Sequence, residues 1–209
     1  MNQPIFYICA VYGGLAVALV IAYLQAQVPI DDLMRDPLAT VNLPPYIGLF
    51  SNLGILLWCA ATTLCLFTSL VLWRANQQRS LSNFLLYSGL LSLLLTLDDL
   101  YLLHEFVFPK VLNVPEKAVL LIYGIAFCTY LIKFRRTIFS TRYWGFLGLA
   151  MVLFFASLSL DVLLPQVISG PTEVLIEDGF KIFGIVIWLG YFLMICICAT
   201  DQIIPTSRS

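Results

Sequence analysis

Long apolar stretches separated by short polar segments dominate the sequence. Six of these stretches are at least about 20 residues long, which is enough for a helix to cross a hydrocarbon layer about 30 Å thick. We predict spans at residues 5–26, 46–73, 81–108, 115–134, 142–164 and 172–200. The pattern therefore predicts an all-α, polytopic membrane helix bundle with six transmembrane helices, and a single transmembrane domain over residues 1–209.

Prolines and acidic residues mark the ends of the spans. Residues 28–45 contain four prolines and three aspartates, so we expect a loop outside the membrane. The third span is expected to end at Phe108, because Pro109 disfavours a helical conformation at the residue before it. The segment from Asn113 to Glu116 is typical of an N-cap and first helical turn, and it opens the fourth span.

The composition excludes a soluble protein. Of 209 residues, 61% are hydrophobic and only 11% are charged, whereas soluble domains average about 25% charged residues. With a net charge of -1, nothing favours a nucleic-acid partner. The six cysteines lie inside apolar stretches without a C-x-x-C pair, which is typical of buried hydrophobic side chains rather than of a disulfide or zinc framework.

The charges divide unequally between the two sides that six spans define. Seven basic residues share a side with both termini: Arg74, Arg79, Lys133, Arg135, Arg136, Arg142 and Arg208. Four lie on the other side, together with eleven of the twelve acidic residues. Basic residues favour the cytoplasmic side, so we predict that both termini are cytoplasmic. The expected location is a bacterial-type inner membrane.

The third span ends in the most polar cluster of the chain. Asp98, Asp99, His104 and Glu105 follow an apolar run, and a charged side chain in the centre of a membrane helix costs roughly 2.5 to 3.5 kcal/mol. On a helix, Asp98, Tyr101 and Glu105 share one face, whereas Asp99 continues a different line of polar residues. Both lines therefore face one pocket only if the helix ends or bends near Asp98. The alternative is that headgroups at the interface solvate these residues.

Other helices bring further acidic residues to the same depth. We predict that a carboxylate near the end of the fifth span and two near the start of the sixth join this cluster, with Lys181 as a counter-charge. Like charges so close together favour bound protons or a bound cation. Oxygen ligands with one histidine suit a divalent metal ion, and that is the only cofactor we consider. The hypothetical metal ligands are Asp98, Asp99, His104, Glu105, Asp161, Glu177 and Asp178, with Asn52 and Tyr101 as further polar residues.

Three functions fit this pattern. The first is cation or proton binding and transport through an acidic pocket near the extracytoplasmic side. The second is a structural, assembly or sensing subunit of a membrane complex, in which the charges form a buried network. The third is an intramembrane metal-dependent hydrolase with His104 or Glu105 as the base. No nucleophile is evident, so the sequence favours a role other than catalysis.

The first span carries small residues at every fourth position. They are Ala10, Gly14, Ala18, Ala22 and Ala26. Such a stripe lets two membrane helices approach closely. Besides membrane lipid, the expected partners are therefore a second copy of the chain or the subunits of a larger membrane complex, bound through this face of the first helix.

Overall fold

Helices form all the regular structure in the described part of the chain. The computed structural model describes the backbone of residues 3–163 and 171–202 and the side chains of residues 9–160, 172 and 174–202. Within these ranges there is no β-strand, which confirms the predicted all-α class. The chain divides into two compact units, Met1–Leu49 and Phe50–Ser209.

The first unit contains one long and two short helices. They are α1 (Gln3–Leu24), α2 (Ile30–Met34) and α3 (Pro37–Thr40). The carboxylate of Asp36 caps α3 by accepting hydrogen bonds from the backbone N–H groups of Leu38 and Ala39, at 2.8 and 3.1 Å. The segment predicted as a proline-rich loop therefore contains two short helices, and the local acidic side chain stabilises the second of them.

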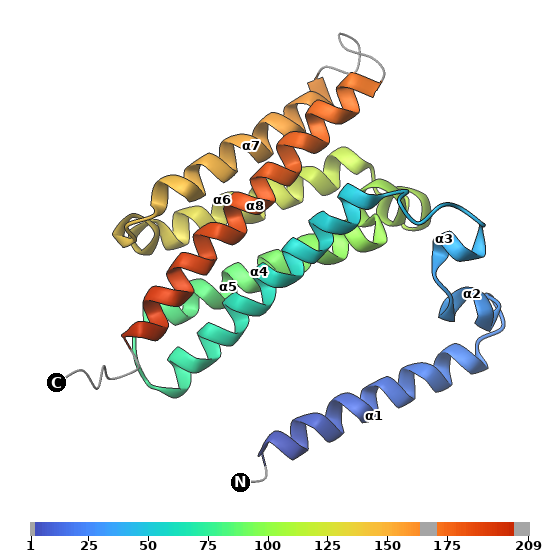
Figure 1. Cartoon of the computed structure of the whole chain (residues 1–209), viewed down its shortest axis with the longest axis horizontal. Coiled ribbons are helices and arrows are strands. Elements are labelled where there is room, and N and C mark those ends of the chain that lie inside the picture. The colour runs from blue at the N-terminus through green and yellow to red at the C-terminus, as the bar shows by residue number, and fades with distance from the viewer. Residues whose placement is uncertain (1–2, 164–170, 203–209) are drawn as a thin grey trace. The chain divides into compact units, whose positions relative to one another are not determined.

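The second unit is a bundle of antiparallel helices with short connections (Figure 1). It contains α4 (Leu49–Arg74), α5 (Arg79–Tyr101), the π-helix η1 (Leu103–Val111), α6 (Glu116–Ser140), α7 (Trp144–Leu163) and α8 (Pro171–Asp201). Because the helices alternate in direction, the end of α5 meets the beginnings of α6 and α8. The opposite end of the bundle brings together the beginning of α5, the connection between α6 and α7, and the end of α8.

Aromatic side chains and hydroxyl groups fill the centre of this bundle. Trp188, Tyr191, Phe84 and Phe192 are fully buried. Trp188 Nε1 donates a hydrogen bond to Ser92 Oγ at 3.0 Å, and other buried serines and threonines of α5 bond to backbone carbonyls or to a tyrosine. The polar line that the sequence predicts on this helix therefore faces the core, where its hydroxyl groups are hydrogen-bonded.

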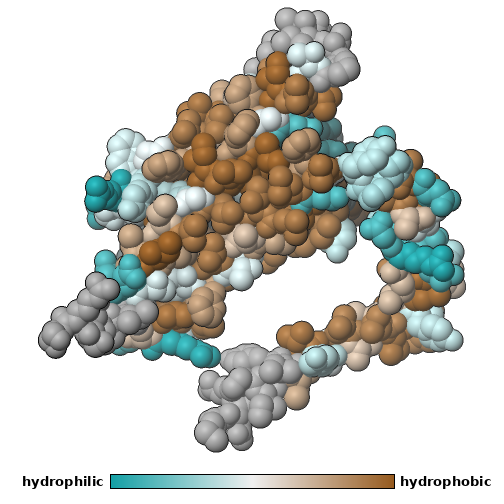
Figure 2. Space-filling view, viewed as in Figure 1, coloured by the Kyte–Doolittle hydropathy of each residue, from teal (hydrophilic) through white to brown (hydrophobic). Residues whose placement is uncertain are grey.

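Four helices are long and apolar enough to cross a membrane: α4, α5, α6 and α8. The described apolar parts of α1 and α7, Cys9–Leu24 and Trp144–Leu160, are shorter. Figure 2 shows a mainly hydrophobic surface along the second unit, with hydrophilic patches toward its ends. These features are compatible with an integral membrane protein, and the number of six spans and the orientation of the termini stay predictions.

The third predicted span differs most from the structure. Its helix, α5, ends at Tyr101 rather than at Phe108, and Pro109 lies inside η1. Leu102 causes the break: its φ of 50° is left-handed, and its backbone N–H bonds to the carbonyl of Asp98. Both Phe106 and Val107 then donate to the carbonyl of Leu102, which starts the wider turns of η1.

Candidate functional site

A cavity of about 530 Å³ lies in the second unit where α5 ends and α6 and α8 begin. We call it the acidic cavity. Its size is within the roughly 300–1,000 Å³ typical of ligand sites. Its polar lining is Asp98, Asp99, His104, Glu105, Glu116, Tyr123, Ser157, Glu177, Asp178 and Lys181. Five elements contribute to this lining, namely α5, η1, α6, α7 and α8, and α4 adds Trp58.

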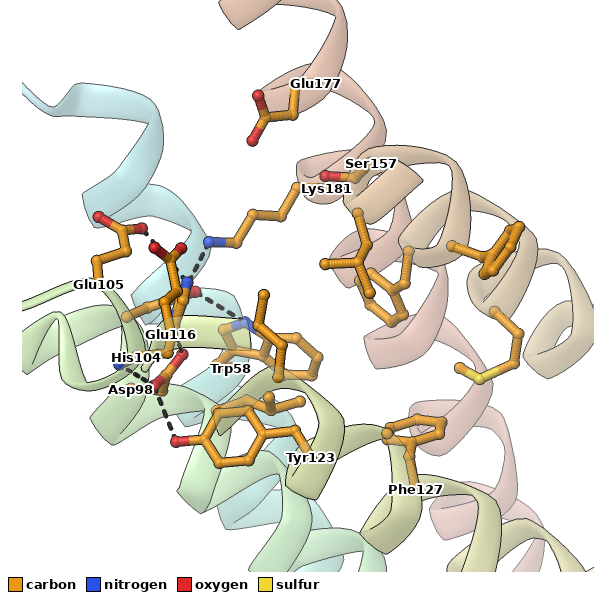
Figure 3. Close-up of a pocket in the computed structure, with 18 of the residues that line it drawn as sticks. Trp58, Asp98, His104, Glu105, Glu116, Tyr123, Phe127, Ser157, Glu177 and Lys181 are labelled. Atoms are coloured by element: carbon orange, nitrogen blue, oxygen red, sulfur yellow. Dashed lines mark hydrogen bonds and ion pairs between the residues drawn. The ribbon is translucent and has the colours of Figure 1, made fainter. Parts of the chain in front are cut away.

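The break after α5 brings His104 back onto Asp98 (Figure 3). The imidazole Nδ1 lies 2.5 Å from Asp98 Oδ2, and the backbone N–H of His104 donates to Asp98 Oδ1 at 3.1 Å. The hydroxyl group of Tyr123, on α6, donates to the same oxygen at 3.0 Å. Asp98 is only 4% exposed, so these contacts replace the water that it loses on burial.

Asp99 connects three helices. Its Oδ1 lies 2.8 Å from Nζ of Lys181 on α8, and its Oδ2 accepts a hydrogen bond from Nε1 of Trp58 on α4 at 3.2 Å. The sequence predicts Lys181 as a counter-charge, and Asp99 is the carboxylate that it contacts. Asp98 and Asp99 both line the acidic cavity, and α5 ends shortly after them. The sequence predicts that the polar lines of these two residues face one pocket only if the helix ends or bends near Asp98.

Carboxylates outnumber cationic groups around the acidic cavity. Besides the two aspartates of α5, its lining includes Glu105, Glu116, Glu177 and Asp178. The side chain of Glu105 is 54% exposed, and its Oε1 lies 3.5 Å from Nε2 of His104. Six carboxylates therefore share one lysine and one histidine. Ionised carboxylates in this number give a cavity a negative potential.

The opposite wall of the acidic cavity is apolar and aromatic. Phe127, Leu131, Met151 and Phe154 lie on it. Trp58 stacks on Phe154 with 5.7 Å between the ring centroids and an interplanar angle of 25°. The cavity thus has a charged side and an aromatic side.

Comparison with known families places the chain in one of them. A family model described as a domain of unknown function (DUF8692) matches residues 10–195. The chain belongs to the DUF8692 family. The matched residues of this DUF8692 chain include all those that line the acidic cavity. Neither a curated protein nor a solved structure is significantly similar to it.

Most of the predicted site residues of this DUF8692 chain whose side chains are described lie around the acidic cavity, but two do not. Asn52 and Tyr101 are exposed and do not line it, and the side chain of Asp161 is outside the described residues. Glu116, Tyr123 and Trp58 also line the cavity but were not predicted as site residues from the sequence. Glu116 had a usable signal, because it opens a span on the same side as the other acidic residues. Tyr123 had none.

The hypothesis of a metal centre in this DUF8692 chain stays a prediction. In the described ranges, no group of three or more His, Cys, Asp or Glu side chains is close enough to hold a metal ion. Asp98 and Asp99 instead bond to His104, Tyr123, Trp58 and Lys181.

The ionisation of His104 is a direct test of this geometry. Its pKa is raised above the usual value of about 6.5 because Asp98 accepts a hydrogen bond from the ring, and burial partly opposes this shift. His104 is the single histidine of the chain, so both imidazole nitrogen signals in NMR spectra of ¹⁵N-histidine-labelled protein come from this residue. We expect its titration midpoint above pH 6.5 and a lower midpoint in Asp98→Asn.

The raised pKa of His104 also makes the stability of the folded protein depend on pH. A raised pKa stabilises the folded protein fully below the unfolded pKa of about 6.5, and this stabilisation disappears as the pH rises through the folded pKa. In the NMR titration of His104, equal midpoints for the wild type and Asp98→Asn would contradict the contact between His104 and Asp98 in solution.

Proposed function

We propose that the protein is an integral membrane protein that binds an organic cation in the acidic cavity, as the binding step of cation transport. The observation that carries this proposal is the charge surplus of six carboxylates around one lysine and one histidine. The contacts of Lys181 with Asp99 and of His104 with Asp98 leave the cavity with more negative than positive charge. A ligand with a positive charge compensates this surplus.

Size and aromatic lining support an organic cation rather than a metal ion. The cavity volume of about 530 Å³ is far larger than a single ion requires. Phe127 is a half-buried aromatic residue of the lining, and the face of such a ring attracts an ammonium group by about 0.5–2 kcal/mol. A small amine or quaternary ammonium with an apolar substituent can contact both sides of the acidic cavity, the carboxylates with its charge and the aromatic side with its substituent.

The proposed orientation places the acidic cavity on the extracytoplasmic side of a bacterial-type inner membrane. The opposite end of the bundle carries Arg74, Arg79, Lys133, Arg135, Arg136 and Arg142. Basic residues of this kind are retained in the cytoplasm during insertion. A ligand would then enter the cavity from outside the cell, and both termini would be cytoplasmic.

Calorimetric titration with benzyltrimethylammonium tests the proposed cation binding. The full chain in detergent is expected to bind this probe, and the double variant Glu116→Gln/Asp178→Asn is expected to bind it more weakly. Each lost carboxylate should cost about 1–2 kcal/mol, or roughly five- to thirtyfold in Kd, before screening by salt. Both residues line the cavity and both are exposed, so the folded structure should persist.

Asp201→Asn is the matched control for this titration. It removes one exposed carboxylate at the other end of α8, away from the acidic cavity. The control should bind the probe as the wild type does. If it weakens binding as much as the double variant, the attraction is a general surface effect. If the wild type does not bind the probe, the proposed function is wrong.

The bonds of Asp99 to α4 and α8 favour a second candidate, a structural or assembly subunit of a membrane complex. Here Asp99, Lys181 and Trp58 would serve to hold the bundle together. The small residues of α1 would bind a second copy of the chain or another subunit. This candidate requires stable co-purification with such a partner and no binding of the cationic probe.

A further inference from the structure

A second cavity, of about 660 Å³, lies at the opposite end of the bundle from the acidic cavity. We call it the basic cavity. It is formed where α5 begins, α6 connects to α7 and α8 ends. Its polar lining includes Arg136, Arg142, Ser80, Thr137, Ser140 and Thr141. The proposed cation binding uses none of these residues, so the two cavities can be tested independently.

The two arginines of the basic cavity have no acidic partner in the described part of the chain. The three ion pairs found there all involve residues of the acidic cavity. Arg79, which lies between the lining residues Gln78 and Ser80, is different because its guanidinium donates to Oδ1 of Asn76 at 2.6 and 3.2 Å. Two guanidinium groups thus border a cavity without a carboxylate to neutralise them.

Several other side-chain donors of the basic cavity are already used, because Ser140 and Thr141 donate to backbone carbonyls and Gln78 Nε2 donates to Oε1 of Gln202. The hydroxyl groups of Ser80 and Thr137 lie 3.0 Å apart and hold α5 against α6. At the beginning of α5, Gln78 is the N-cap residue but makes no side-chain capping bond. The first N–H groups of a helix lack partners within the helix, and together with the helix dipole they favour a negative charge.

Part of the basic cavity is apolar, and this feature favours a lipid over a free ion as the ligand. Leu81, Ile195 and Ala199 contribute to its lining. On the same stretch of α8, Met194 and Ile197 are 46% exposed each. Ile195 and Ala199 are themselves buried, so an acyl chain would extend over the exposed side chains of Met194 and Ile197 while its headgroup stays at the arginines. A free phosphate ion gains nothing from these apolar contacts.

We infer that the basic cavity binds the phosphate group of an anionic phospholipid, with Arg136 and Arg142 as the phosphate ligands. A guanidinium group forms two parallel hydrogen bonds to phosphate oxygens. Basic pockets between membrane helices are suited to anionic headgroups on the cytoplasmic side. In the proposed orientation this end of the bundle faces the cytoplasmic leaflet.

The test uses the full chain, delipidated in detergent and titrated calorimetrically with dihexanoyl phosphatidylglycerol. Binding to the wild type is expected, together with much weaker binding to dihexanoyl phosphatidylcholine, whose headgroup carries no net charge. The variant Arg136→Gln/Arg142→Gln is expected to weaken phosphatidylglycerol binding at least about tenfold, because each lost hydrogen bond to a charged group costs that much. Arg136→Lys/Arg142→Lys keeps the charge and should weaken binding less.

Arg135→Gln is the matched control for the arginine variants. Arg135 is adjacent in sequence, equally charged and exposed, but it does not line the basic cavity. It should bind phosphatidylglycerol as the wild type does, and circular dichroism should show the same helix content in all variants. The proposal is wrong if Arg135→Gln weakens binding equally or if phosphatidylcholine binds equally well. If inorganic phosphate displaces the lipid and binds with the same affinity as the lipid does, the ligand is a free phosphate ion and the lipid proposal is wrong.

Discussion

Replacing Lys181 with methionine is expected to lower the free energy of unfolding by about 2–4 kcal/mol. The reason is that Lys181 Nζ lies 2.8 Å from Asp99, whose side chain is only 12% exposed. Without the lysine, this mostly buried carboxylate loses its ion-pair partner. The Lys181 side chain is itself 40% exposed, so solvent reduces the cost below that of a fully buried pair. Unfolding by SDS in mixed micelles measures the change.

The double variant Lys181→Met/Asp99→Asn separates the stranded charge from lost packing. The introduced asparagine is neutral, and its carbonyl oxygen can still accept the hydrogen bond that Trp58 Nε1 gives to Asp99. The double variant should therefore recover most of the lost stability. If it is as unstable as Lys181→Met alone, the cost comes from the lysine side chain and not from the unpaired carboxylate.

The same Lys181→Met variant distinguishes the two candidate functions. Loss of Lys181 removes one positive charge from the acidic cavity, and Asp99 then has no cationic partner within the described residues. Under the proposed cation binding, folded Lys181→Met protein should bind benzyltrimethylammonium more tightly than the wild type. Under a purely structural role, only stability and assembly should change.

Much of the acidic cavity could be predicted because helix direction alternates along the chain. Short connections force consecutive helices to run antiparallel, so acidic residues at the end of the third span lie at the same end as those at the start of the sixth. Positions along the sequence alone therefore place Asp98, Asp99, Glu177, Asp178 and Lys181 at one end of the bundle, without knowledge of any contact.

The pairing within the acidic cavity could not be predicted in the same way. A left-handed Leu102 is not evident from the sequence, because leucine rarely adopts a positive φ. That one residue ends α5 and returns His104 to Asp98. Tyr123 and Trp58 are part of the site because of how α4 and α6 pack against α5, and their sequence neighbours are ordinary apolar residues.

Substituting Gly184 with alanine is expected to destabilise the bundle by about 1–3 kcal/mol, as overpacking in a tight core does. A Cβ atom at Gly184 would lie 2.6 Å from Cε1 and 2.8 Å from Cδ1 of Phe154. This ring has little freedom to move, since it stacks on Trp58 and also lies against Trp188. Either the ring shifts into the acidic cavity that it lines or α7 moves away from α8.

Gly190→Ala on the same helix provides the control for this effect. A Cβ atom at Gly190 meets no neighbouring atom within 4 Å. Alanine is also the better helix former by about 1 kcal/mol, so this variant should be as stable as the wild type or more stable. Because Phe154 lies on the aromatic wall of the acidic cavity, Gly184→Ala should additionally weaken benzyltrimethylammonium binding, whereas Gly190→Ala should leave it unchanged. If the two variants are equally stable, α7 and α8 are packed less tightly around Gly184 than the distances from its Cβ position to Phe154 indicate.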